Sequence, residues 1–99
     1  MTFEIEFHPK AAKEAKELLR MNIEFASEFR NFLQALAHEP YKFPKKKGKL
    51  KSCRALNFKI KDNSWRLVFR IIEARDVVEI LAVGLHDNAY NSAIRRVEQ

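Results

Sequence analysis

Four basic side chains on two neighbouring predicted strands are the first residues whose types and spacing suggest chemistry. The strands are predicted because apolar and polar residues alternate in residues 56–61 and 66–71, as in a half-buried sheet. The apolar residues of both strands share one face, and the opposite face carries Lys59, Lys61, Arg66 and Arg70. Lys61 alone would simply extend into solvent. The set of four predicts a surface that binds an anion.

The apolar pattern also predicts how these two strands pair. An even-numbered loop such as Asn63-Ser64 places Ile60 opposite Leu67, whereas an odd-numbered loop would spoil both faces. Lys61 then lies opposite Arg66. Like charges directly opposite one another are destabilising, by an amount comparable to the roughly 0.2–1 kcal/mol of a good cross-strand pair. This pairing therefore adds to the inference that an anion binds there.

A third predicted strand brings a histidine and a tyrosine towards the basic face. It covers residues 77–85 and follows a three-residue turn at residues 73–75. We expect one side to continue the apolar face, with Val77, Leu81, Val83 and Leu85 interrupted by Glu79. The other side then holds Val78, Ile80, Ala82 and Gly84. Because Ala82 and Gly84 are small, they leave room near Arg66, and His86 and Tyr90 follow at the strand's end.

The positive charge of the chain is concentrated in residues 40–61, which contain nine Lys or Arg and no Asp or Glu, although the whole chain has a net charge of +6. A solvated loop without a ligand is the commoner fate of a lysine run. Here the run leads directly into the basic sheet face, which favours a polyanion partner, usually nucleic acid. The predicted RNA-binding residues are Lys45, Lys46, Lys47, Lys49, Lys51, Arg54 and Arg70.

The elements before the sheet are predicted to cover its apolar face. Alternation in residues 3–7 predicts a short strand, and Pro9 suits the first turn of a helix that runs to about Met21. Asn22 is a candidate cap for a second helix, whose wide stripe of Phe and Leu ends before Pro40. Asp87 or Asn88 is a candidate cap for a short terminal helix. The predicted class is α+β, in the order β-α-α-β-β-β, with an antiparallel sheet packed against a helical hairpin.

Composition sets the remaining expectations. With 99 residues and 46% apolar residues, we expect a single folded domain over residues 1–99. The single cysteine, Cys53, excludes an internal disulfide and fits a reducing compartment, so a cytoplasmic protein without a membrane segment is expected. Two glycines leave no phosphate-cradling loop, no Cys or His spacing suits zinc, and no serine lies in a nucleophile-elbow context. No cofactor and no metal is expected.

The chain resembles the RelE/ParE family of bacterial type II toxins over nearly its whole length. Residues 65–69, WRLVF, resemble the family's aromatic or small residue, arginine and aliphatic run, and residues 80–86, ILAVGLH, resemble its apolar strand ending in glycine and a polar or basic residue. Tyr90 follows as a family tyrosine often does. The resemblance implies the RelE/ParE-like, microbial RNase-like fold and one of two activities. RelE-like members cleave mRNA, generally in the ribosomal A site, whereas ParE-like members bind and poison DNA gyrase.

The residues carried over from the family favour a nuclease. Arg66 matches the sheet arginine, Lys59 a preceding lysine, His86 the basic position after the glycine and Tyr90 the catalytic tyrosine. An earlier family lysine falls at Asn57, and Lys61 could replace it only in part. RNA cleavage by the 2′-hydroxyl needs a proton acceptor, a proton donor and cations for the phosphate. We therefore expect His86 as acid or base, Tyr90 in proton transfer or base stacking, and Arg66, Lys59 and Lys61 as charge stabilisers.

Two other functions stay open at this point. One is a ParE-like gyrase inhibitor without catalysis, and the other is a nonenzymatic nucleic-acid-binding domain. The expected partners are a cognate antitoxin, mRNA and the ribosome, and a homodimer or a toxin–antitoxin hetero-oligomer is open. Apolar residues on the polar sheet face, namely Val68, Ile72, Val78 and Ile80, predict that something covers part of it. The antitoxin, the terminal helix and a second copy of the chain are the candidates.

Overall fold

The chain folds as a four-stranded sheet between two layers of helix. The computed structural model describes residues 2–97. The elements are β1 (Glu4–Phe7), α1 (Pro9–Met21), a 3₁₀ turn (Ile23–Phe25), α2 (Ala26–His38), β2 (Cys53–Ile60), β3 (Asn63–Ile72), β4 (Val77–Leu85) and α3 (His86–Val97). The strand order is β1-β4-β3-β2, with β1 parallel to β4 and the other pairs antiparallel. The α+β class and the β-α-α-β-β-β order with a terminal helix are confirmed.

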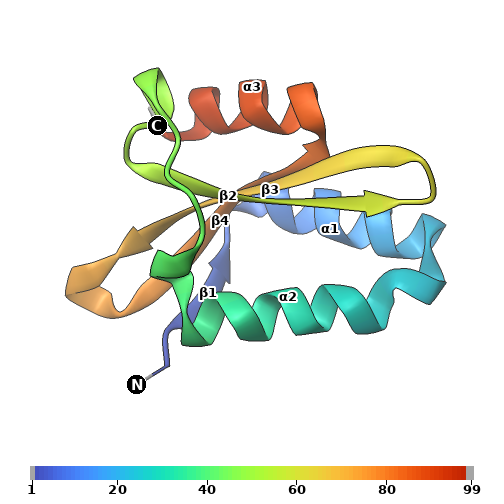
Figure 1. Cartoon of the computed structure of the whole chain (residues 1–99), viewed down its shortest axis with the longest axis horizontal. Helices are drawn as coiled ribbons and strands as arrows, with labels where there is room; N and C mark the ends of the chain where they lie inside the picture. The colour runs from blue at the N-terminus through green and yellow to red at the C-terminus, as the bar shows by residue number, and fades with distance from the viewer. Residues whose placement is uncertain (1, 98–99) are drawn as a thin grey trace.

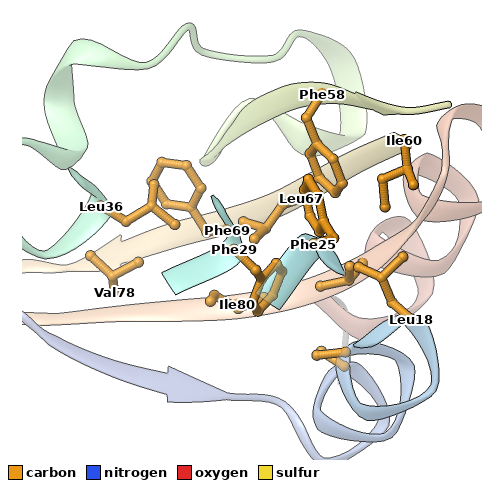
Figure 2. Packing of buried hydrophobic residues seen from close by; sticks show 13 residues of the cluster. Leu18, Phe25, Phe29, Leu36, Phe58, Ile60, Leu67, Phe69, Val78 and Ile80 are labelled. Carbon is orange, nitrogen blue, oxygen red and sulfur yellow. The ribbon is translucent and has the colours of Figure 1, made fainter. Parts of the chain in front are cut away.

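The helical hairpin of α1 and α2 packs on one face of the sheet, and α3 packs on the other (Figure 1). Apolar side chains from the hairpin and the sheet form the hairpin-side core, in which Phe25 stacks on Phe58 with ring centroids 5.2 Å apart. Figure 2 shows how Leu67, Phe69 and Ile80 of the central strands point into this core. The predicted role of the hairpin as cover for the apolar face is confirmed.

The terminal helix covers part of the opposite face. Its Ala89 and Ala93 are buried against Val68, Leu81 and Ala82 of the sheet, and we call this cluster the α3-side core. Of the three candidates for this cover, the structure shows the terminal helix. The side chains left beside α3 on this face are the polar ones, and they form the candidate site.

The predicted register of β2 against β3 is wrong, although the face of the sheet predicted for the side chains of each strand is right. Ile60 lies opposite Asn63, Leu56 opposite Leu67, and Arg66 opposite Asn57. The turn is therefore Lys61-Asp62, and Lys61 adopts a left-handed conformation with φ 57°. The predicted turn, Asn63-Ser64, has the same length, so the two registers differ in where the turn falls. A positive φ at a two-residue turn matches the twist of paired strands, and a turn at residues 61–62 lets β3 begin at Asn63. Lys61 and Arg66 are not cross-strand neighbours.

The predicted sides of β4 are also partly wrong, because a β-bulge interrupts the alternation. Val68 pairs with Ala82 while Phe69 pairs with Ile80, so Leu81 is an extra residue between them. Val78 and Ile80 consequently face the hairpin-side core, as does Val83 beyond the bulge, whereas Leu81 and Ala82 both belong to the α3-side core. A bulge reverses the faces on either side of it, and alternation in the sequence does not reveal it.

The helix ends agree with the sequence except at two caps. Residues 9–21 form α1 as predicted, and the His8 side chain caps it by accepting from the Lys10 amide. Asn22 does not cap the second helix; its side-chain amide donates to the Leu18 carbonyl. α3 begins at His86, before the predicted Asp87 or Asn88 cap. Within residues 2–97, no helix is long and apolar enough to span a membrane.

Candidate functional site

Arg66 is the centre of the polar cluster beside α3. Although it is charged, only 6% of its surface is exposed. Its Nε donates to Asn57 Oδ1 at 2.9 Å, a terminal nitrogen hydrogen-bonds to His86 Nε2, and its guanidinium carbon lies 5.9 Å from the centre of the Tyr90 ring. Strands β2 and β3 therefore supply Asn57 and Arg66, and α3 supplies His86 and Tyr90. The sequence placed Arg66, His86 and Tyr90 together, and the structure brings them into contact.

The contact with Arg66 defines the state of the His86 ring. A guanidinium only donates hydrogen bonds, so Nε2 of His86 is the acceptor and carries no proton. The proton of the neutral ring then lies on Nδ1, which is 3.1 Å from Asp87 Oδ1. Half of the His86 side chain is exposed. The His86 ring thus has Nε2 towards Arg66, and the Asp87 carboxylate contacts the other ring nitrogen, Nδ1.

A hollow of about 350 Å³ adjoins this cluster and is open to solvent. It is lined by Asn57, Phe58, Lys59, Ser64, Trp65 and His86. Lys59 is exposed and lies opposite Ser64 on the neighbouring strand. Because both residues line the hollow, a phosphate bound in it would lie near the Lys59 ammonium and the His86 ring. Lys59 gives this hollow a positive charge, which suits an anionic ligand.

Lys46 joins the site from the loop before β2. The loop runs along the edge of β2, where the Lys46 amide donates to the Cys53 carbonyl at 3.0 Å and the Ala55 amide donates to Pro44 at 3.2 Å. Among the lysines of residues 45–51, Lys46 alone is partly buried. Burial, and then the positive charge of Arg66, lower the pKa of Lys46. The site therefore holds a second cation that binds its proton less firmly than an ordinary lysine does.

The other predicted basic residues divide between two sides of the sheet. Arg54 lies on the hairpin side, where its guanidinium donates to the Tyr41 and Phe43 carbonyls. It lines a second, polar hollow of about 210 Å³ with Lys45 and Lys51. Arg70 forms an ion pair with Glu79 at 2.6 Å. Lys47 and Lys49 are exposed on the loop.

Lys61 is exposed in the β2–β3 turn, five residues before Arg66 in the chain and outside the contacts of its guanidinium.

Three features around Arg66 were not predicted from the sequence: the Asn57 hydrogen bond, the Asp87 contact and the proximity of Lys46. Asp87 could have been found, because a carboxylate directly follows the candidate histidine. Lys46 could not, because its position depends on how the loop folds back along β2.

Solved structures of RelE toxins share this fold. An Escherichia coli RelE double mutant in the free state has a TM-score of 0.77 and 22% identity, over 98% of this chain and 99% of that chain. The RelBE2 toxin–antitoxin complex from Mycobacterium tuberculosis has a TM-score of 0.60 and 20% identity, over 87% and 100%. The intact E. coli RelBE complex has a TM-score of 0.54 and 21% identity, over 85% and 96%.

Sequence comparison identifies the family. No curated protein sequence matches the chain significantly. Residues 6–93 match the family described as the ParE-like toxin of type II bacterial toxin–antitoxin systems. This match extends from the end of β1 into α3 and includes every residue of the Arg66 cluster. The chain is therefore a toxin of the RelE/ParE superfamily and belongs to the ParE-like toxin family of type II toxin–antitoxin systems.

Proposed function

We propose that this toxin is an endoribonuclease that cleaves mRNA, with the RNA 2′-hydroxyl as nucleophile. The observation that carries the proposal is the contact between Arg66 and Nε2 of His86 beside an open, cationic hollow. A buried guanidinium can bind a phosphate, and a neutral imidazole next to it can take a proton from the neighbouring ribose. Proton transfer requires such a basic nitrogen, whereas binding to another protein does not require one.

The reaction assigns a task to each side chain of the cluster. The RNA phosphate draws the Arg66 guanidinium onto its oxygens, which frees Nε2 of His86. Nε2 then takes the 2′-hydroxyl proton while the 2′-oxygen attacks phosphorus, the P–O5′ bond breaks, and a 2′,3′-cyclic phosphate forms. Arg66, Lys46 and Lys59 balance the charge that builds on the phosphate. Tyr90 and Lys46 are the side chains with a transferable proton for the leaving 5′-oxygen.

The substrate and the partner follow from the same proposal. We expect mRNA in the ribosomal A site as substrate, and the exposed lysines at positions 45, 47, 49 and 51 as contacts to RNA phosphates. We also expect a cognate antitoxin as inhibitor. Complexes of a toxin with its antitoxin are among the structural neighbours, which supports this expectation.

A purified translation system followed by primer extension on the mRNA tests the proposal. Addition of the wild-type protein should give cuts at discrete positions, and these cuts should be absent with His86→Ala. The variant Arg75→Ala is a matched control, because Arg75 forms an exposed ion pair with Glu6 away from the site. Intact mRNA and continuing translation with the wild-type protein would refute nuclease activity.

A second candidate function is inhibition of DNA gyrase without catalysis. The family match favours it, because that family is described as ParE-like. A supercoiling assay with purified gyrase distinguishes the two functions. The gyrase function requires loss of supercoiling activity that His86→Ala does not relieve, whereas the nuclease function requires that gyrase stay active.

A further inference from the structure

A buried ion pair outside the candidate site joins the two helical layers. Glu14 of α1 and Arg96 of α3 are 82 residues apart in sequence, yet both carboxylate oxygens accept from the Arg96 guanidinium, at 2.8 and 2.9 Å. Arg96 is only 7% exposed. Such a two-pronged contact defines orientation as well as distance, because the guanidinium and the carboxylate must be coplanar and face each other.

The pair also completes the open edge of β4. β1 pairs with β4 only as far as Phe7 opposite Ile80, so the backbone of β4 beyond that residue has no strand on this side. The Val83 amide donates to Glu14 at 3.1 Å, and Arg96 donates to the carbonyl of the bulge residue Leu81 at 2.8 Å. Both side chains therefore satisfy buried backbone groups that would otherwise be unpaired. The contact binds α1, β4 and α3 together at one point.

The rest of the α3 interface is made of side chains that are small or only partly buried. The helix has 12 residues, a length at which an isolated helix is marginal in water. Its most deeply buried apolar contacts are made by the small residues Ala89 and Ala93, whereas Tyr90, Ile94 and Val97 are only partly buried against the same core. Smooth, small contacts allow a helix to rotate and slide more easily than interlocking ones do. A buried ion pair contributes more to a defined geometry than to net stability in some proteins.

The helix that Arg96 holds also carries the proposed catalytic groups. His86 is its first residue, Tyr90 lies one turn later, and Arg96 lies about 9 Å further along the axis at 1.5 Å per residue. We propose that Glu14 and Arg96 are positioning residues that hold α3 in the one orientation in which His86 and Tyr90 meet Arg66. This inference rests on the proposed nuclease function for its catalytic consequence, and on the structure alone for the docking of α3.

Hydrogen exchange and cleavage kinetics, measured on the same variants, test the proposal. The variants are Glu14→Gln, Arg96→Lys and the double variant Glu14→Gln/Arg96→Gln, which leaves no unpaired buried charge and so retains the fold. We expect amides of α3 to lose at least tenfold protection while those of β3 keep theirs. We expect the cleavage rate at saturating ribosomes to fall at least tenfold, with an unchanged half-saturating ribosome concentration, because neither residue faces the hollow.

The matched controls are the neighbouring residues of the same type on the same two helices. Glu17→Gln and Arg95→Gln alter exposed side chains and should leave both readouts at wild-type values. Unchanged α3 protection in all three variants would overturn the proposal, as would undocked α3 with full cleavage. If the wild-type protein cleaves no RNA, the nuclease function fails, but the exchange measurement still decides whether the pair holds α3.

Discussion

Arg66 and His86 share a hydrogen bond in which the guanidinium donates and Nε2 of the ring accepts. The Arg66 guanidinium, which stays positively charged, thus donates to the ring nitrogen that could otherwise bind a proton. Because a guanidinium has only donors, the Nε2 lone pair points at Arg66 for as long as the two groups remain in contact. An anion that binds Arg66 more strongly than the ring does would release the base at the moment when substrate arrives.

The first prediction concerns this pair. Arg66→Lys keeps a positive charge but loses the planar fork that reaches Asn57 and His86 together, and His86→Gln keeps a polar side chain that cannot accept a proton. We expect each to lower mRNA cleavage by roughly 10²–10⁴-fold, the usual contribution of a general acid or base. Primer extension gives the rate, and circular dichroism verifies the fold. Full activity in both variants would refute the assignment.

The second prediction separates Lys46 from its exposed neighbour. Burial and the Arg66 charge lower the pKa of Lys46, so its ammonium loses its proton at a lower pH than an ordinary lysine. Cleavage that needs this charge should fall on the alkaline side, and Lys46→Arg, which stays charged, should move that fall to higher pH. Lys46→Ala should lower activity without lowering thermal stability, because it removes a charge beside another charge. Lys47→Ala is the control, and equal effects of both alanine variants on the pH–rate profile would contradict the prediction.

The third prediction assigns Asp87 an orienting role. Its carboxylate accepts from Nδ1 of His86, but 94% of the Asp87 side chain is exposed, so the contact is weak. Exposed pairs contribute about 0–1 kcal/mol, which corresponds to at most about a fivefold change in rate. Asp87→Asn should therefore lower cleavage by a few-fold. Nitrogen-15 NMR of the ring should show a smaller share of the Nδ1–H tautomer, and an unchanged tautomer ratio would argue against the role.

The fourth prediction concerns the stability of the fold at alkaline pH. Burial raises the pKa of the Cys53 thiol, which is fully buried in the α3-side core. Above about pH 8.5 the thiol ionises in the unfolded chain but stays protonated in the folded one. The unfolded state then binds fewer protons, so the free energy of unfolding should decrease as pH rises. Urea titrations between pH 7 and 10 measure this slope. Cys53→Ala should have a shallower slope, and an identical slope would contradict the prediction.

The layers of the fold could be predicted from sequence because local patterns define them. The alternation in residues 56–60, the Phe and Leu stripe of α2, and Pro9 at the start of α1 each act within a few residues. The register of β2 against β3 and the bulge at Leu81 are different, since each depends on which of several local solutions packs best against the hairpin. Apolar residues recur at every second position, so shifting one strand by an even number of residues preserves both faces and leaves the sequence pattern unchanged.

The part of the candidate site that lies on β3 and directly after β4 could be predicted from the sequence. Arg66 lies in a strand, and His86 and Tyr90 follow the neighbouring strand, so pairing of those strands brings them together. The contacts that other parts of the chain make with Arg66 could not be predicted from the sequence. Lys46 reaches the site through a loop with no periodicity, and the bond between Asn57 and Arg66 depends on the register. The residue that departs from the family lysine thus acts as a hydrogen-bond partner of the central arginine.

The fifth prediction uses the observed register to separate two lysines. Lys59 lines the hollow beside His86, whereas Lys61 lies in the turn in a left-handed conformation. That conformation costs a non-glycine residue roughly 1–2 kcal/mol. Lys61→Gly should therefore stabilise the protein by up to about 1 kcal/mol, after the greater flexibility of glycine in the unfolded chain is subtracted. It should leave cleavage unchanged, while Lys59→Ala should lower cleavage by about tenfold, equivalent to about 1.4 kcal/mol of transition-state stabilisation. Denaturant titration and primer extension on both variants measure these effects. If Lys61→Gly lowered cleavage and Lys59→Ala did not, the anion would bind at the turn. The Lys61–Arg66 pairing predicted from sequence would require that position.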